Sequence, residues 1–226
     1  MVQVGAITTA DSIQLATHAE KMGVDGISSV GPIYYAASSD MAIAHYRQIA
    51  EATVLPFFPY QLGDHSIPGD TITFVKRLMD IPNVTGMKLT TNQLLDISLI
   101  HNYAGERLKL FSGSDELFCH ASLCGTVGAI GSFYNLWGPQ CKYVMEEFLQ
   151  GNYKLTKKFM LEFQNIIQTI MPNIWTFLRS AMRLKYNIDI GQTKPPLANT
   201  HRPWENEDVL KMMDKLERIT DTVIQK

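Results

Sequence analysis

Residues 84–91 read Val84-Thr85-Gly86-Met87-Lys88-Leu89-Thr90-Thr91, a short and mostly apolar stretch that carries one lysine. The stretch predicts a β-strand that presents Lys88 at its end. An amine at the end of an apolar strand is partly removed from water, which lowers its pKa and frees its lone pair for attack on a carbonyl. The central hypothesis is that Lys88 forms a Schiff base with a 2-oxo acid. The alternative is a lysine that simply leaves the strand for solvent.

Outward from this stretch, apolar strand-like segments alternate with amphipathic helix-like segments. Six strands are expected, at 1–6, 24–30, 54–60, 83–88, 108–112 and 127–131. Helices are expected after them, at 11–22, 38–52, 71–79, 92–103, 115–124 and 139–149. Pro56 and Pro59 argue against a central place in the sheet for the third strand. A strand-then-helix unit that repeats in this way predicts parallel strands with helical crossovers.

Beyond Gly151 the strand pattern stops. Further helices are expected at 153–169, 173–186 and 205–224, with a proline-containing loop at 192–203. The last helix has the clearest pattern, because its apolar residues share one face. We therefore expect a partial (β/α) barrel over residues 1–150 and a helical region over 151–226.

Two α/β architectures compete for the first part. A doubly wound sheet usually carries a glycine-rich phosphate loop after an early strand, and neither GxGxxG nor GxxxxGK[ST] occurs here. A (β/α) barrel instead distributes its chemistry over the ends of several strands. Polar side chains follow the predicted strands at Tyr60, at Lys88 and Thr90, and in the segments 113–116 and 131–135. The barrel is favoured.

Composition excludes several classes of protein. Hydrophobic residues make up 46% of the chain, enough for a sizeable core and too many for a disordered chain. The formal charge is −2 and the basic residues are dispersed, so no nucleic-acid partner is expected. Neither a membrane-spanning run nor a signal peptide is visible. Cys119, Cys124 and Cys141 lack a metal-type spacing, which indicates reduced thiols in a cytoplasmic protein without a metal site.

In order along the chain, six segments resemble the N-acetylneuraminate lyase / dihydrodipicolinate synthase superfamily of class I aldolases, with the lyase branch nearer. They are VQVGA at 2–6, GPIYY at 31–35, LPFFPY at 55–60, GMKLT at 86–90, SGSDE at 112–116 and GAIGSFYN at 128–135. The resemblance covers essentially the whole chain. It implies a TIM (β/α)8-type barrel with a C-terminal three-helix extension, and a cytoplasmic, homotetrameric enzyme that needs no cofactor.

The resemblance also implies roles for individual residues. Lys88 matches the imine-forming lysine, whose protonated imine acts as an electron sink while a carbon–carbon bond breaks or forms. Tyr60 matches the tyrosine that moves a proton to and from the aldol oxygen. Tyr34, rather than Tyr35, is the better match for a tyrosine that reaches into a neighbouring subunit's site. For Tyr34 the alternative is plain interface packing, and for Tyr60 it is a core aromatic residue.

Substrate class is decided by a further group of residues that match those holding a polyol chain in the lyase branch. They are Thr90, Gly113, Asp115, Glu116 and Ser132. A hydroxylated substrate needs such acceptors and hydroxyls because its buried hydroxyl groups must be paired. The two acids also suit a helix N-terminus. In addition, the segment 61–68 lacks the arginine with which the synthase branch commonly takes a dicarboxylate.

The expected reaction is therefore cleavage of an N-acetylneuraminate-like sugar acid to pyruvate and N-acetylmannosamine. Two alternatives stay open. One is another pyruvate-dependent aldolase or synthase of the superfamily, such as a dihydrodipicolinate synthase-like enzyme or a keto-deoxy sugar acid aldolase. The other is a non-catalytic homologue that serves as a subunit or regulatory partner.

Two departures from the family pattern affect this expectation. The loop over residues 61–69 is longer than usual, and its His65 is either a substrate contact or an exposed loop histidine. The match begins at the family's third barrel strand, so the first two βα units, with their carboxylate-binding loop, have no counterpart. A closed barrel needs eight strands, and the first strand here would leave an open edge. We expect an N-terminally shortened chain with little or no lyase activity.

Overall fold

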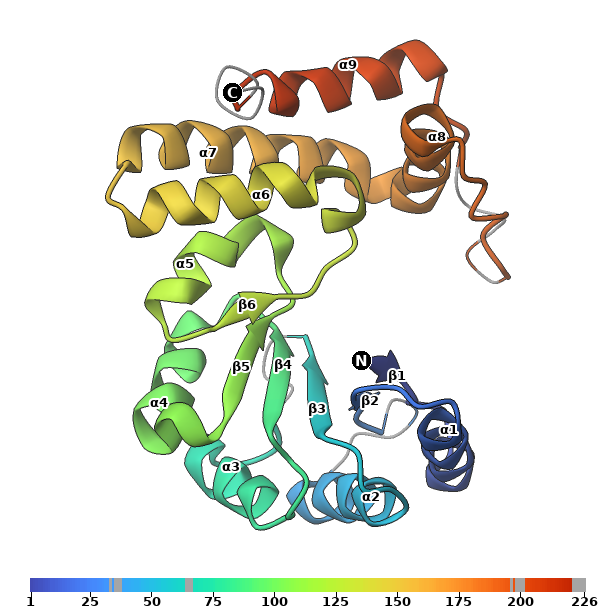
Figure 1. The fold of residues 1–226 in the computed structure, drawn as a ribbon, viewed down its shortest axis with the longest axis vertical. Helices are drawn as coiled ribbons and strands as arrows, with labels where there is room; N and C mark the ends of the chain where they lie inside the picture. Colours follow the sequence, from blue (N-terminus) through green and yellow to red (C-terminus); the bar gives the residue numbers. More distant parts are fainter. Residues whose placement is uncertain (33, 35–37, 64–66, 196, 198–201, 221–226) are drawn as a thin grey trace. The chain divides into compact units, whose positions relative to one another are not determined.

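The computed structural model describes residues 1–226 except 33, 35–37, 64–66, 196, 198–201 and 221–226. The chain forms two compact units, Met1–Ile130 and Gly131–Lys226. The first is an α/β unit in which a curled parallel sheet forms a half-barrel, and the described part of the second is helical (Figure 1). The domain boundary expected after residue 150 stays a prediction.

The sheet of the first unit holds six parallel strands in the order β1-β2-β3-β4-β5-β6, so each strand pairs with the one before it. The strands are β1 Val2–Gln3, β2 Ile27–Val30, β3 Phe57–Leu62, β4 Gly86–Thr90, β5 Lys109–Ser112 and β6 Gly128–Ala129. The helices are α1 Thr9–Lys21, α2 Ser39–Glu51, α3 Thr71–Met79, α4 Leu94–Ala104 and α5 Phe118–Leu123. Short 3-10 helices lie at Gly105–Arg107 (η1) and Asp115–Leu117 (η2). The predicted strand-and-helix alternation is confirmed.

Side-chain caps start three of these helices. Thr8, Ser38 and Asp70 each accept a hydrogen bond from the backbone three residues later, at the first turn of α1, α2 and α3. Each cap satisfies a backbone N–H that has no partner inside the helix. Local sequence therefore determines where these crossovers begin.

Strand β3 occupies an interior position in the sheet, in spite of its proline. It pairs with β2 on one side and with β4 on the other, and Pro59 lies opposite Ser29. The expectation that the prolines weaken the case for a central place is wrong. Pro59 withholds only one N–H from the ladder, and it lies on the buried face of the strand together with Phe57.

Several strand ends differ from expectation, and β1 and β6 contain only two residues each. The difference matters most in β4, where Lys88 lies in the middle of the strand and not at its end. Pairing continues past Lys88 on both sides, with Thr90 opposite Leu62 and Leu89 opposite Ser112. The backbone around the lysine is therefore held by both neighbouring strands.

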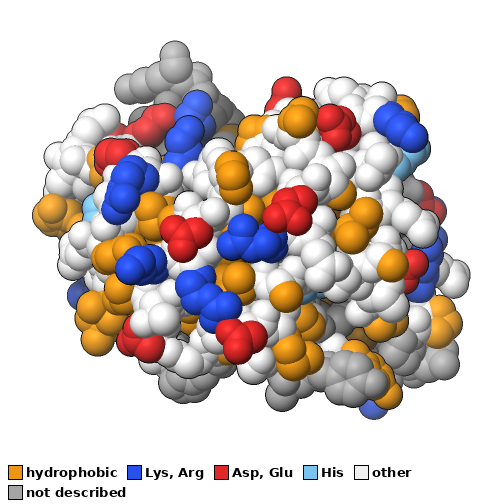
Figure 2. Space-filling model, turned by 90° about the horizontal axis from the view of Figure 1, so that it is seen from below, with side chains coloured by type: hydrophobic (Ala, Val, Ile, Leu, Met, Phe, Trp, Pro, Cys, Tyr) orange, Lys and Arg blue, Asp and Glu red, His pale blue; other side chains and the backbone are white. Residues whose placement is uncertain are grey.

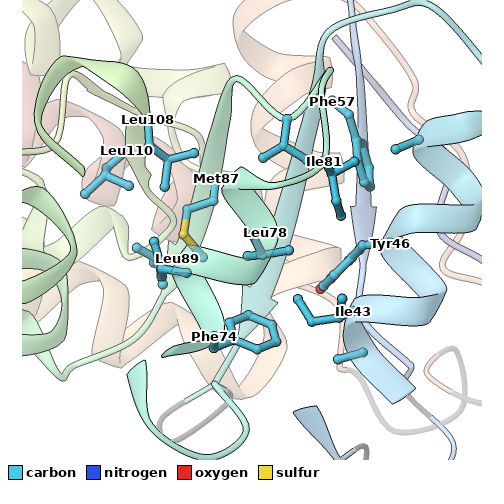
Figure 3. Close-up of a cluster of buried hydrophobic side chains, with 14 of the residues drawn as sticks. Ile43, Tyr46, Phe57, Phe74, Leu78, Ile81, Met87, Leu89, Leu108 and Leu110 are labelled. Atoms are coloured by element: carbon cyan, nitrogen blue, oxygen red, sulfur yellow. The ribbon is translucent and has the colours of Figure 1, made fainter. Parts of the chain in front are cut away.

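The two faces of the sheet differ in burial. Phe57, Met87, Leu89 and Leu110 of the strands lie buried in one core with side chains of α2 and α3 (Figure 3). Most of the alternate strand residues, which point to the other face, are only partly buried. They include Phe58, Tyr60, Lys88, Thr90 and Phe111. The chemistry-bearing side chains of β3 and β4 therefore share the less covered face.

Helix α6, Tyr134–Leu149, belongs to the second unit and begins well before Pro139, at which the sequence predicts its start. Pro139 lies inside the helix, and Trp137 has non-helical angles of φ −120° and ψ 22°. A proline removes one helical hydrogen bond and clashes with the preceding turn. Two helical segments meet at this kink, so the predicted helix from Pro139 matches the segment after the kink, and the sequence missed the turn from Tyr134 before it.

The other helices of the second unit are α7 Tyr153–Ile170, α8 Ile174–Tyr186 and α9 Asn206–Glu217, with the 3-10 helix η3 at Met171–Asn173. Trp137, Phe163 and Phe177 are fully buried and form a cluster of aromatic rings. Lys185 donates hydrogen bonds to the Leu136 carbonyl and to Glu217, which links α6, α8 and α9. Helix α9 ends at Glu217, earlier than the expected end at residue 224.

The molecular surface mixes polar and apolar side chains. On the face drawn in Figure 2, Lys and Arg side chains lie interspersed with Asp and Glu, and hydrophobic side chains lie between them. Within the part of the chain that the structure describes, no helix combines the length and apolarity needed to cross a membrane.

His45 is a buried titratable group that links α2 to α1, since its Nδ1 lies 2.9 Å from Thr9 Oγ1. Burial lowers the pKa of His45 below its ordinary value of 6.5, and an interaction with the Val30 backbone opposes this shift. As the pH falls below about 6.5, the unfolded chain takes up a proton that the folded chain resists. We expect the free energy of unfolding to fall with pH in that window.

Urea unfolding from pH 7.5 to pH 5 in wild type, His45→Gln and His18→Gln checks this expectation. His18 is exposed in the same unit, so its variant should keep the wild-type slope. His45→Gln should flatten the slope. An unchanged slope in His45→Gln would assign the pH dependence to other groups.

Candidate active site

Strands β3 and β4 bring Tyr60 and Lys88 together. The two residues lie opposite each other in the parallel ladder, and the Lys88 Nζ lies over the Tyr60 ring, 4.1 Å from its centroid. Both side chains are partly buried. An amine is thus held against the ring of a phenol, on rigid strands of one sheet.

Thr90 completes a small polar group on this face. It follows Lys88 by two residues, which places both side chains on the same side of β4. Its Oγ1 lies 3.0 Å from the Tyr60 hydroxyl, and either oxygen can be the donor. The phenol is therefore anchored at its tip by Thr90, while Lys88 lies over its ring.

Gly113 lies where the chain leaves β5, close to the same side chains. Its N–H donates to the Leu89 carbonyl at 2.7 Å. A Cβ at position 113 would overlap Thr90 Oγ1 and lie 2.8 Å from Lys88 Cε. Only a residue without a side chain fits here, so Gly113 forms a wall of the site.

Asp115 and Glu116 follow directly on that turn, in η2. Asp115 is 5% exposed and Glu116 is partly buried. Ser114 ties the turn to the end of β4, because its Oγ donates to the Thr91 carbonyl at 3.2 Å. Two acidic residues are therefore carried by a turn that is fastened to the lysine-bearing strand.

The structure does not test the remaining predicted site residues. Ser132 belongs to the second unit, where its carbonyl accepts a hydrogen bond from Asn135. Tyr34 is 74% exposed in the segment between β2 and α2. Tyr35 and His65 lie outside the described residues. The roles expected for Ser132, Tyr34 and His65 stay predictions.

Two buried polar residues behind the site were missed in the sequence. Tyr46 is fully buried in α2, and Gln61 is buried in β3. Tyr46 lies on the apolar stripe of an amphipathic helix, and a buried phenol needs a hydrogen-bond partner. This pattern was the signal by which the sequence could have indicated its role. Among the described residues, no three His, Cys, Asp or Glu side chains are grouped to hold a metal ion.

The chain is similar to known proteins along most of its length. The sequence profile of the Dihydrodipicolinate synthetase family matches residues 1–216. The N-acetylneuraminate lyase of Salmonella paratyphi B is 31% identical over 200 residues, which span 88% of this chain and 67% of that protein. The N-acetylneuraminate lyase of an Enterobacter species is 28% identical over 206 residues, which span 90% of this chain and 69% of that protein.

Solved structures show the same fold. The wild-type sialic acid aldolase of Ruminococcus gnavus superposes with a TM-score of 0.85 at 23% identity, covering 99% of this chain and 74% of that one. The N-acetylneuraminate lyase of Proteus mirabilis gives a TM-score of 0.79 at 26% identity, covering 96% of this chain and 74% of that one.

These relatives place the chain, by family, among the carbon–carbon lyases. It belongs to the Dihydrodipicolinate synthetase family.

Proposed function

We propose that the chain is a Schiff-base aldolase that cleaves N-acetylneuraminate-like sugar acids to pyruvate and N-acetylmannosamine. The observation that carries the proposal is the position of the Lys88 amine against Tyr60, whose hydroxyl is bonded to Thr90. A nucleophilic amine beside a group that can move protons is the arrangement that imine chemistry requires. The lyase relatives support the choice of substrate.

In the proposed reaction, Lys88 Nζ attacks the keto carbon of the substrate, and the keto oxygen takes up protons relayed from the amine through Tyr60 and leaves as water. The bond between the adjacent carbon and the hydroxyl-bearing carbon then breaks, and its electrons move to the iminium nitrogen. Tyr60 moves the proton of that hydroxyl, and the aldehyde of the amino sugar departs. Protonation of the enamine and hydrolysis of the imine release pyruvate and free Lys88.

The acceptors around the lysine suit a hydroxylated substrate. We assign the polyol contacts to Thr90, Gly113, Asp115, Glu116 and Ser132. Buried sugar hydroxyls cost free energy unless each finds a partner, and carboxylates and hydroxyls supply acceptors for them. The burial of Asp115 and its turn fastened to β4 support this assignment.

We further propose that the six strands correspond to strands three to eight of the family's barrel, followed by a C-terminal three-helix region. The strand order β1 to β6, in which the first and last strands each have one partner among the described strands, supports this assignment. Coverage of 74% of the Ruminococcus gnavus chain supports it too. A polypeptide of these 226 residues alone should therefore turn over sugar acids slowly.

The proposed enzyme is cytoplasmic and oligomeric, a homotetramer as in the resemblance above, with Tyr34 directed to a neighbouring subunit. The three cysteines are free thiols, as suits a reducing compartment. Helix α4 exposes Leu95, Leu99 and Tyr103, which share one helix face at a spacing of four residues. Such an exposed apolar face supports association with a further copy.

Reductive trapping tests the proposed function directly. The 226-residue chain is incubated with pyruvate at high concentration and reduced with borohydride, and the adduct is mapped by peptide mass spectrometry. The expected result is one adduct, on Lys88, even where turnover of N-acetylneuraminate is low. A folded sample that gives no adduct would refute the imine mechanism for this chain.

A further inference from the structure

Behind the candidate site lies a hydrogen-bonded pair of buried side chains, Tyr46 and Gln61. The Tyr46 hydroxyl donates to the backbone carbonyl of Tyr60 at 3.1 Å and accepts from Gln61 Nε2 at 2.9 Å. Tyr46 is among the largest fully buried side chains of the protein, and Figure 3 shows it within the core that packs against the sheet. The pair is thus on the opposite face of β3 from the Tyr60 phenol.

The Tyr60 carbonyl lies where the pairing of β3 with β2 ends. The pairing of β2 with β3 ends at Val30 opposite Tyr60, whereas the pairing of β3 with β4 continues to Leu62. Beyond Tyr60, β3 therefore has one neighbouring strand among the described residues instead of two. The Tyr46 hydroxyl supplies a donor to the carbonyl at this transition, from a helix instead of a strand.

The residues around Tyr46 leave room for its phenol. A Cβ at Gly31 would lie 2.9 Å from the Tyr46 oxygen, so glycine at this position leaves room for it. Burial raises the pKa of Tyr46, so its hydroxyl keeps its proton and stays a donor throughout the working pH range. Removal of the hydroxyl would leave the Gln61 amide buried without that acceptor, which costs more than the hydrogen bond itself.

We propose that Tyr46 and Gln61 are positioning residues for Tyr60. Their hydrogen bonds fix the backbone of β3 at Tyr60, which holds the phenol on Thr90 with its ring beneath the Lys88 Nζ. Neither residue touches substrate, and both act through Tyr60. The inference rests on the proposed function, because it assigns the role of the proton-moving phenol to Tyr60.

The test compares Tyr46→Phe with the wild type, with Gln61→Met, and with Tyr153→Phe as a matched control at an exposed tyrosine of the second unit. The rate constant of pyruvate trapping on Lys88 should fall about tenfold in Tyr46→Phe. A change of this size corresponds to the free energy of one typical hydrogen bond. The fall should be smaller in Gln61→Met, which retains the Tyr46 donor. Tyr153→Phe should match the wild type.

A double-mutant cycle separates positioning from a general loss of structure. In a Tyr60→Phe background, the further change Tyr46→Phe should leave the trapping rate constant unchanged, because the group through which Tyr46 acts has already been removed. An equal fold-loss in both backgrounds would overturn the proposal.

Amide hydrogen exchange tests the same idea without any reaction. The Gly63 N–H donates to the Thr90 carbonyl at the end of the β3–β4 pairing, and the Gly113 N–H donates to Leu89 on the β5 side. Tyr46→Phe should speed exchange at Gly63 and leave Gly113 close to the wild type. If wild type gives no pyruvate adduct, the proposed function fails, and exchange at Gly63 alone decides the positioning role. Unchanged exchange at Gly63 would overturn it.

Discussion

Replacement of Lys88 with Ala should remove the pyruvate adduct altogether. Lys88 supplies the nitrogen of the proposed imine, and its Nζ is the amine that the structure places over the Tyr60 ring. Because the side chain is only partly buried, the free energy of unfolding should change by about 1 kcal/mol or less. The measurement is peptide mass spectrometry after borohydride reduction, together with urea unfolding of the same samples.

Lys109→Ala is the matched control. Lys109 lies at the start of the neighbouring strand β5 and is exposed, so its variant loses a lysine of the same sheet without touching Tyr60 or Thr90. It should give the wild-type adduct. Persistence of the full adduct in Lys88→Ala would assign imine formation to another lysine and withdraw the proposed mechanism.

Replacement of Gly113 with Ala should damage the site and the fold together. The added Cβ would overlap Thr90 Oγ1 and crowd Lys88 Cε, so Thr90 must turn away or the end of β5 must move. Overpacking of this kind costs about 1–3 kcal/mol. Displacement of Thr90 also breaks its hydrogen bond to Tyr60, so we expect the trapping rate constant to fall about 100-fold, as for misplaced catalytic groups.

Gly128→Ala in the next strand, β6, provides a graded comparison. A Cβ there would lie 3.3 Å from the Phe111 ring, a crowding that a shift of a few tenths of an ångström relieves. Its unfolding midpoint and trapping rate constant should stay much nearer the wild type. If Gly113→Ala and Gly128→Ala behave alike, the close approach at Gly113 has no special part in the site.

The outline of the first unit was predictable because its signals are local. The alternation of strand-like and helix-like apolar patterns depends only on nearby sequence, as do helix-capping residues such as Thr8 and Ser38. Together they predict six parallel strands with crossover helices. Pro59 misled the prediction because proline withholds only one hydrogen bond, and pairing on both sides of β3 tolerates that loss where propensity alone would not. Pro139 marked the start of the helical segment after the kink in α6, but no local pattern indicated the turn before it.

The site was predictable as a set of residues but not as a geometry. Resemblance to a family selected Lys88, Tyr60, Thr90 and Gly113, yet the interior position of Lys88 in β4 depends on pairing with two other strands. Tyr46 escaped notice because its hydroxyl meets the Tyr60 carbonyl across α2 and β3, a contact between segments that no local pattern encodes. Ser132, in the second unit, stays a prediction.

The strand order of the sheet has a consequence for how the protein emerges during synthesis. Since each described strand after β1 pairs with the one made just before it, these strands find a partner as soon as they are made. Chains generally fold from the N-terminus while they are still being made, and neighbouring contacts shorten the search. The group formed by Tyr60, Lys88, Thr90 and Gly113 needs only the first 113 residues, so it can assemble before the aromatic helices of the second unit leave the ribosome.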